Sequence, residues 1–302
     1  MRVTVLSRSQ SIYGTRRLAE AARGRGHVVR VVDPLQVEMG LGAGRPALFH
    51  RGEPFPRTDV ALPRIAVSIH QYGLAVVTQL QQLGVPLLNG AAGIGASRDK
   101  MRCLQLLASS GVAVPRTVMA GDPSGLREMV KHVGGVPVLV KLVGANERGG
   151  VMICETLQSL EAALEAILGL GQNIVVQQYV REAKGRDLRA LVVGGRVVAA
   201  LRRRPPVGRM ARSLGRGARF EAAALAPACH RAAVAAARVV DLEVCAVDML
   251  DVRGGPLVFE VNGSPGLREL EEACGVDAAD AILARAEEIA GVRRPAARAA
   301  AR

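Results

Sequence analysis

The sequence predicts a mixed α/β and α+β fold, with a doubly wound domain first and two α+β lobes after it. Apolar runs at residues 3–6 and 28–32 flank a helical pattern at 13–25, and this β-α-β order is typical of a doubly wound domain. From Pro115 onward that alternation is lost, which indicates an α+β arrangement. Near the C-terminus, two strand-like runs flank an Asp-Val-Arg-Gly-Gly turn, which predicts a β-hairpin.

These observations divide the chain into domains. We expect an N-terminal domain over residues 1–95 and a second domain over 96–290, whose lobes cover about 96–178 and 179–290, followed by a basic tail over 291–302. A chain of 302 residues that is 49% hydrophobic can form two or three compact cores. Aromatic residues make up only 2% and Trp is absent, so aliphatic side chains must supply the packing.

The chain is strongly basic. Its formal charge of +13 favours acidic partners, such as nucleic acid, ATP, acidic peptides or the ribosome surface. Arginine dominates the basic residues, and a GC-rich coding sequence would also give Arg and Ala. We therefore give the charge about half of its weight as evidence for a polyanion site.

The cysteines and the N-terminus indicate a compartment. The five cysteines are widely spaced and form no CxxC pair, which favours a reduced cytoplasm over disulfides or zinc. The opening MRVTVLS reads as a short strand and lacks the long apolar core of a signal peptide. No stretch has the unbroken apolar length of a membrane span. We expect a cytoplasmic protein that does not bind membranes.

The N-terminal domain continues with a strand at 59–63, a helix at 72–83 and a strand at 85–89. Residues 90–95, GAAGIG, lack the Lys-Ser/Thr ending of a P-loop and the dinucleotide spacing, which favours a flexible connection. Ser97 is expected to cap a helix that runs through 101–110.

Two lysines, one before and one within the middle third of the chain, are candidate anion-binding residues. Lys100 lies in the first turn of the predicted helix, where it opposes the helix dipole and is either solvated or beside an anion. Lys141 lies in the middle of a strand at 138–143, and alternation turns it away from Val140. A glycine-bearing loop at 144–150 follows, with backbone N–H groups that could cover phosphates. A strand at 151–154, a helix at 157–168 and a strand at 173–176 come next.

The C-terminal hairpin carries the strongest site. Glu260 and Asn262 are two residues apart on one strand and so share a face, and pairing across the hairpin adds Asp248. Carboxylate and amide oxygens are hard ligands that suit Mg²⁺. The alternative is a solvated hairpin whose outward positions are polar. Because both acids lie within apolar strands, where an unpaired charge would be costly, we predict a metal site.

The hairpin also resembles a known family. The string VDML…GPLVFEVNGSPGL is similar to the metal-binding hairpin of ATP-grasp ligases, and specifically of RimK-type α-L-glutamate ligases. Other segments resemble the family in order along the chain, among them LSRSQSIYGTRRLAEAA, RDKMRCLQLLA, VKLV and QQYVREAKGRDLRALVVG. The resemblance implies a pre-ATP-grasp domain and a two-lobed ATP-grasp fold, which join a carboxylate to an amine with ATP and Mg²⁺ or Mn²⁺. It also implies that residues 64–72 either line the substrate pocket or form a structural loop.

The resemblance assigns roles to matching positions. It places Lys100 and Lys141 at the nucleotide phosphates and Gln178 and Tyr179 at the adenine turn, although the family tends to have Glu where Gln178 stands. The side chains of Asp187 and Arg189 share a face of the next strand, and the family places them at the nucleotide and the reacting centre. The alternative is an exposed ion pair on an edge strand.

The most basic stretch, RRRPPVGRMARSLGRGAR, matches an active-site loop of the family. The family core reads Phe-Arg-Ser-Asn, whereas this chain has Met210, Ala211, Arg212 and Ser213, so either the arginine has moved by one position or the loop has shifted in register. By this resemblance Ala211, Arg212 and Ser213 contact the nucleotide. The predicted catalytic residues are Arg189, Arg203 and Arg212.

Three functions remain open. The first is a ligase that adds glutamate, or another amino acid, to an acidic protein or peptide C-terminus such as that of a small-subunit ribosomal protein. The second is a nucleotide-binding pseudoenzyme that binds ATP without releasing phosphate. The third is an RNA- or ribosome-binding protein with steeply salt-dependent binding. We favour the ligase, and expect a homo-oligomer.

Overall fold

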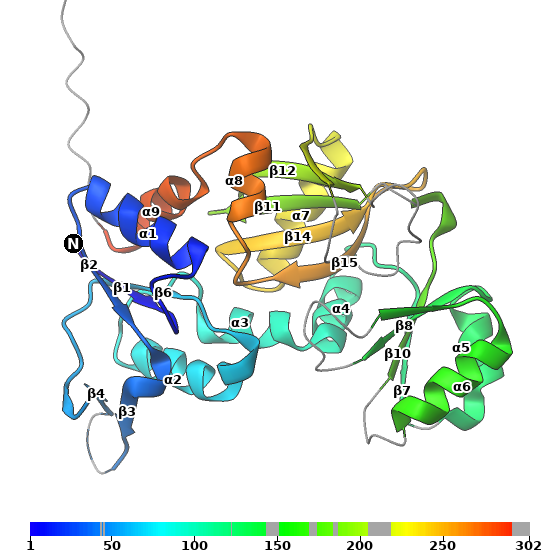
Figure 1. Ribbon diagram of the computed structural model, residues 1–302, viewed down its shortest axis with the longest axis horizontal. Coiled ribbons are helices and arrows are strands. Elements are labelled where there is room, and N and C mark those ends of the chain that lie inside the picture. Colours follow the sequence, from blue (N-terminus) through cyan, green and yellow to red (C-terminus); the bar gives the residue numbers. More distant parts are fainter. Residues whose placement is uncertain are drawn as a thin grey trace, which may run out of the picture.

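The computed structural model describes residues 1–42, 44, 46–121, 123–142, 151–168, 174–183, 187–204 and 219–291 (Figure 1). The described chain forms an N-terminal domain, a central lobe and a C-terminal lobe, and the C-terminal lobe lies beside both of the others. None of its helices is both long enough and apolar enough to cross a membrane.

The N-terminal domain is built on a parallel sheet, as predicted. β1 (Arg2–Leu6) pairs in parallel with β2 (Val28–Val32) and with β6 (Val60–Pro63), in the order β2-β1-β6. α1 (Tyr13–Gly24) connects the first two strands, because Leu18, Ala19 and Ala22 give it a buried face. The remaining elements of the domain are η1 (Pro34–Gln36), β3 (Val37–Gly40), β4 (Ala47–His50), β5 (Glu53–Pro54), η2 (Val67–Ile69) and α2 (His70–Gln82).

Three sequence predictions at the end of this domain are wrong. Residues 85–89 form no strand, since only Leu87 makes a single β-bridge, to Ala61. The segment 90–95 is not a loop but most of a helix, α3 (Ala91–Arg98). Ser97 lies inside that helix, and Asp99 caps α4 (Lys100–Ser109) by accepting hydrogen bonds from the N–H groups of Met101 and Arg102.

One of the two glycines of α3 has a packing role that the sequence alone does not show. A Cβ placed on Gly93 would lie 2.1 Å from the carbonyl oxygen of Asp241, which is a backbone atom of the C-terminal lobe. A Cβ on Gly95 would meet nothing closer than 3.5 Å, at the Leu74 side chain. The two positions share one helix, but only Gly93 is required for the close approach of the lobe.

We therefore expect opposite effects from two alanine substitutions. Gly93→Ala must push α3 away from the C-terminal lobe, and we expect it to lower the free energy of unfolding by roughly 2–3 kcal/mol. Gly95→Ala should raise it by about 0.5–1 kcal/mol, because Ala has the better helix propensity and the site has room. Urea denaturation of both variants checks this, and equal effects would contradict the packing role of Gly93.

The central lobe is an antiparallel sheet covered by helices on one face (Figure 1). The strand order is β7-β10-β8-β9, and its core side chains contact one another rather than the other lobes. The helices α5 and α6 cover the core face, where Leu126, Val130, Leu160 and Leu164 are buried. The elements are β7 (Thr117–Ala120), η3 (Pro123–Gly125), α5 (Leu126–His132), β8 (Val138–Leu142), β9 (Val151–Cys154), α6 (Leu157–Leu168), β10 (Ile174–Gln178) and η4 (Arg181–Ala183).

The C-terminal lobe is a five-stranded antiparallel sheet in the order β13-β12-β11-β14-β15. One face packs on α4 and α7 (Pro227–Val239), and the other packs on α8 (Arg268–Cys274), α9 (Ala278–Ile289) and the N-terminal domain. The strands are β11 (Asp187–Val193), β12 (Arg196–Arg204), β13 (Arg219–Ala222), β14 (Val244–Leu250) and β15 (Leu257–Asn262). Since β11 lies in the middle, the alternative of an edge strand for Asp187 and Arg189 is wrong.

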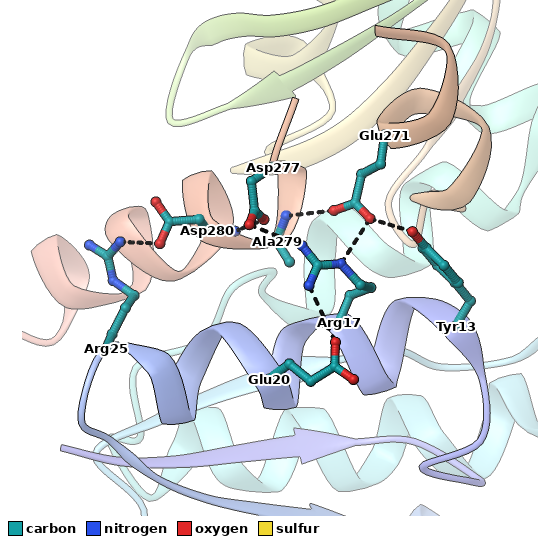
Figure 2. A network of polar contacts seen from close by, with 8 residues as sticks. All are labelled: Tyr13, Arg17, Glu20, Arg25, Glu271, Asp277, Ala279 and Asp280. Carbon is teal, nitrogen blue, oxygen red and sulfur yellow. Dashed lines mark hydrogen bonds and ion pairs between the residues drawn. The ribbon is translucent and has the colours of Figure 1, made fainter. Parts of the chain in front are cut away.

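The N-terminal domain and the C-terminal lobe share one hydrophobic core. Val3, Val5 and Leu18 of the first pack in the same cluster as Leu270 and Leu283 of the second. A polar network runs along the same interface between α1 and the helices α8 and α9 (Figure 2).

Glu271 is the centre of this network. Its carboxylate accepts hydrogen bonds from the Tyr13 hydroxyl at 2.7 Å, from Nε of Arg17 at 3.0 Å and from the backbone N–H of Ala279 at 3.2 Å (Figure 2). Arg17 also pairs with Asp277 at 3.0 Å. With its side chain only 8% exposed, Glu271 holds the two parts together with charge-assisted bonds.

Candidate active site

The predicted metal ligands lie together on the β14–β15 hairpin. Asp248 and Glu260 stand directly opposite each other, and Asn262 stands opposite Ala246, so the three side chains occupy one face. A register shift follows Asp248, because Met249 pairs with Val258 and leaves Phe259 as the extra residue of a β-bulge. The bulge was not predicted from the sequence.

Two arginines surround Asp248. Nε and Nη2 of Arg189 donate to the two carboxylate oxygens of Asp248, each at 2.7 Å, which is a bidentate pair. Nη2 of Arg203 lies 3.8 Å from Asp248, and its Nε lies 3.9 Å from Asp187. Burial acts to raise the pKa of Asp248, but the charge and hydrogen bonds of Arg189 outweigh it and keep the pKa below its ordinary value. Asp248 is therefore ionised.

Burial has the opposite outcome at Asp187. Its pKa is raised, mainly by burial, since Arg203 compensates only in part and Asp248 adds a like charge. Asp187 and Arg203 are partners in the β11–β12 ladder, and Arg189 and Asp248 are partners in the β11–β14 ladder. The sheet register thus places two acids and two arginines side by side.

Lys141 brings the central lobe to this group. Its Nζ lies 5.4 Å from the centre of the Phe259 ring on the bulge of β15. Burial, together with the like charge of Lys100, lowers the pKa of Lys141 to about 8, although the charges of Glu260 and Asp248 act to raise it. Lys100 begins α4. The interactions of Lys141 with Glu260 and Asp248 bring a cation of the central lobe to anions of the C-terminal lobe, with Lys100 near that cation.

The predicted adenine turn begins at the end of β10. Gln178 ends β10, and its side-chain oxygen accepts a hydrogen bond from the N–H of Arg116 at 3.3 Å while its own N–H donates to the Arg116 carbonyl at 2.8 Å. Tyr179 follows it and is partly exposed. The glycine-bearing loop at 144–150 and the predicted nucleotide contacts Ala211, Arg212 and Ser213 lie outside the described residues.

The donor set fits a magnesium ion. Within the described ranges, no three His, Cys, Asp or Glu side chains come close enough to hold a metal ion on their own, so a site here needs the amide of Asn262 beside Asp248 and Glu260. Each oxygen of Asp248 accepts one bond from Arg189, and a carboxylate has about four lone-pair positions. The oxygen of Asn262 accepts a hydrogen bond from the N–H of Ser264 at 2.9 Å. Together these side chains offer the carboxylate and amide oxygens that Mg²⁺ prefers.

Known families match the whole length of this arrangement. A model described as the RimK PreATP-grasp domain matches residues 1–94, and one described as the RimK-like ATP-grasp domain matches residues 97–286. This chain belongs to the RimK-like ATP-grasp family. It is accordingly an ATP-dependent carbon–nitrogen ligase. Among the relatives of this RimK-type chain, a "probable alpha-L-glutamate ligase" of Teredinibacter turnerae is 43% identical over 283 residues, 94% of each chain. One of Thioalkalivibrio sulfidiphilus is 42% identical over 294 residues, covering 97% of this chain and 98% of the relative.

Solved structures show the same fold. The ATP-grasp ligase PsnB, in complex with a minimal precursor, matches the RimK-type chain with a TM-score of 0.74 at 22% identity, covering 94% of this chain and 98% of PsnB. The D-alanine–D-alanine ligase of Bacillus anthracis matches with a TM-score of 0.69 at 17% identity, covering 96% of each chain. Another PsnB structure contains Mg and ADP. The predicted ATP-grasp fold is therefore confirmed.

Sequence reasoning missed two residues at this site. Phe259 faces Lys141, and a signal existed, because it is one of only four Phe residues and stands beside Glu260. Asn89 is buried, and its amide N–H group donates to the carbonyls of Val244 and Gly263 at 2.7 and 2.8 Å, which ties the start of α3 to both ends of the β14–β15 hairpin. No sequence pattern indicated that tie.

Proposed function

We propose that this RimK-type ligase adds glutamate to the C-terminus of an acidic protein or peptide. The observation that carries the proposal is the interaction of Lys141 of the central lobe with Glu260 and Asp248 of the C-terminal lobe, with Lys100 near the same ammonium. Cations that face metal-binding acids across an interface suit a triphosphate, whose charge both groups must share. The names of the relatives support glutamate as the amine donor.

Each residue has a proposed part in the reaction. Lys100 and Lys141 bind and orient the phosphates, while Asp248, Glu260 and Asn262 hold Mg²⁺, with Mn²⁺ as an alternative. The bound ion would neutralise charge on the phosphates. Asp187, Gln178 and Tyr179 would contact the nucleotide. Arg189 and Arg203, which already surround Asp248, would stabilise negative charge at the reacting centre, and Arg212 is proposed to assist them.

The proposed ligase reaction has two steps. A carboxylate oxygen of the acceptor attacks the γ-phosphorus of ATP, an acyl phosphate forms and ADP leaves. The amine of glutamate then attacks the acyl carbon, phosphate leaves, and the nitrogen loses a proton to give the amide. Positioning and charge neutralisation supply most of the acceleration.

The proposal of an acidic acceptor is based on the net charge of the chain. A net charge of +13 favours an acidic partner, and a small-subunit ribosomal protein is the acceptor that the family resemblance suggested. A cytoplasmic location, where ATP is available, and a homo-oligomer are part of the same proposal.

Mass spectrometry of an acidic C-terminal peptide tests the function. With ATP, Mg²⁺ and glutamate, we expect the peptide to grow by whole glutamate residues while one phosphate is released for each. Growth with a different amino acid would replace glutamate as the donor. ATP binding without phosphate release, across a panel of amino acids and acceptors, would show a pseudoenzyme instead.

A further inference from the structure

A half-buried arginine lies at the ligand-binding edge of the N-terminal sheet. Arg64 directly follows β6, and its N–H donates to the carbonyl of Leu6, the last residue of β1, at 2.8 Å. The carboxyl ends of parallel strands are where open α/β sheets bind ligands. The resemblance implies only that residues 64–72 line the substrate pocket or form a structural loop, and the proposed reaction gives Arg64 no ligand of its own.

The guanidinium reaches from this edge to the loop that follows the metal hairpin. Nη2 of Arg64 donates to the carbonyl of Pro265 at 2.6 Å. A Cβ on Gly14, in the first turn of α1, would lie 3.0 Å from the same nitrogen, so glycine leaves the space that the arginine fills. Arg64 therefore lies between the start of α1 and residues just past Asn262.

The positive charge of Arg64 is not balanced by a carboxylate in the described part of the chain. Its side chain makes the one hydrogen bond to Pro265 and no ion pair there. Desolvation of the guanidinium, together with the like charge of Arg98, lowers the pKa of Arg64 to about 10. An arginine that is desolvated beside a second arginine is expected to have an anionic partner.

The surroundings add to this demand for an anion. Arg98 is fixed nearby by donating to the carbonyl of Ile65 at 2.7 Å. Neither α1 nor α2 has an acidic residue in its first turn or a side-chain cap, so the positive ends of both helices lack a compensating acid of their own. Nδ1 of His70, the first residue of α2, is buried without a hydrogen-bond partner in the described structure.

This cationic group adjoins the proposed site of reaction. Arg98 is two residues before Lys100, and Pro265 is three residues after Asn262. A Cβ on Gly263 would lie 3.1 Å from Oγ of Ser97, so the end of α3 contacts the turn after the metal ligands. Arg64 and Arg98 thus flank the same turn that Asn262 begins. Arg64 remains partly exposed, which leaves it accessible to a small ligand.

We propose that Arg64, with Arg98 beside it, binds a substrate carboxylate that does not react. The inference rests on the proposed ligase function, in which both the incoming amino acid and the acidic acceptor carry such a group. A guanidinium can hold a carboxylate with two parallel hydrogen bonds. The chemistry is the same for either source, and kinetics separates them.

Steady-state kinetics of Arg64→Met and Arg64→Lys is the first test. We expect Arg64→Met to raise KM by roughly 10- to 100-fold for one substrate only, with a much smaller change in kcat, and Arg64→Lys to restore part of the loss. A raised KM for glutamate assigns the site to the amino acid, and a raised KM for the peptide assigns it to the acceptor. If Arg64 only holds the Pro265 turn, kcat changes and both of these KM values stay constant, which overturns the proposal.

Amide analogues test for the carboxylate itself. Glutamine and the α-amide of glutamate each lack one carboxylate, as do acceptor peptides with one acidic side chain amidated. Wild type should discriminate against one of these by roughly 10- to 100-fold in kcat/KM, and Arg64→Met should lose most of that discrimination. Unchanged discrimination in the variant would contradict the assignment. The matched control is Arg8→Met, because Arg8 follows β1 at the same sheet edge but is exposed and paired with Asp33 at 3.1 Å.

A binding measurement separates this inference from the ligase function. Titration calorimetry of glutamate and of the acidic peptide, into the full chain with a non-hydrolysable ATP analogue, needs no turnover. Weaker binding of one of them to Arg64→Met than to wild type or Arg8→Met supports the site even if no amide product forms. An active wild type with equal affinities in Arg64→Met overturns this inference alone. Absence of binding to wild type overturns it as well.

Discussion

Asp248→Asn is expected to reduce kcat/KM for the ligase reaction by about 1,000-fold, equivalent to roughly 4 kcal/mol of transition-state stabilisation. The substitution keeps the shape of the side chain but removes a negative charge that Arg189 binds through both oxygens. It removes one of the two carboxylates proposed to hold Mg²⁺. Phosphate release in the presence of glutamate and an acidic peptide is the measurement.

Asp251→Asn is the matched control for this variant. Asp251 directly follows β14, on the same hairpin, and accepts a long contact from the thiol of Cys229 at 3.9 Å. Its substitution should leave kcat/KM within about twofold of wild type. Should Asp248→Asn keep more than a tenth of the wild-type rate while Asp251→Asn behaves as expected, Asp248 does not hold a catalytic metal.

Lys141→Met is expected to weaken ATP binding by roughly 100-fold, about 3 kcal/mol, because a buried ammonium is removed from the phosphates. The pH dependence separates this role from packing. With the pKa of Lys141 lowered to about 8, wild type should lose ATP affinity as the pH rises above 8 and the side chain becomes neutral. Lys141→Arg stays charged and should show no such loss. Calorimetry between pH 7 and 9.5 tests this, and identical profiles for wild type and Lys141→Arg would exclude the role.

Lys141→Met should also stabilise the nucleotide-free protein. The pKa of Lys141 is lower in the folded chain than its ordinary value of 10.5, so between pH 8 and 10.5 the unfolded chain binds more protons and stability rises with pH. At neutral pH the folded protein instead bears the cost of a buried charge. We expect Lys141→Met to raise the free energy of unfolding by about 1–2 kcal/mol in urea at pH 7. A loss of stability would mean that Glu260 already compensates the charge.

The sequence predicts correctly those elements in which the spacing of apolar residues alone indicates which side chains are buried. β2, β9 and α6 have the predicted bounds, because their residues alternate or repeat as the core requires. The strand expected at 85–89 failed although its residues are apolar, since an apolar run cannot show that only Leu87 finds a pairing partner. The helix α3 was missed because its glycines resemble a loop, whereas Gly93 is needed for contact with Asp241.

The candidate site likewise has a part that follows from local sequence and a part that does not. Glu260 and Asn262 share a face because they are two residues apart on one strand, and hairpin pairing adds Asp248. The pairing of Arg189 with Asp248 depends on β11 lying next to β14, which no local pattern encodes. The bulge at Phe259 and the approach of Lys141 likewise arise only from tertiary structure.

The contacts of Glu271 and the core around Leu18 have a mechanical consequence. Since the N-terminal domain and the C-terminal lobe share one core and a charged network, they should move as a single rigid body. The central lobe has its own core and joins that body through the chain near Pro115 and after Gln178. Any opening that admits ATP must therefore swing Lys141 away from Asp248 and Glu260. A nucleotide bound between Lys141 and the two acids, as proposed, would then favour the closed arrangement.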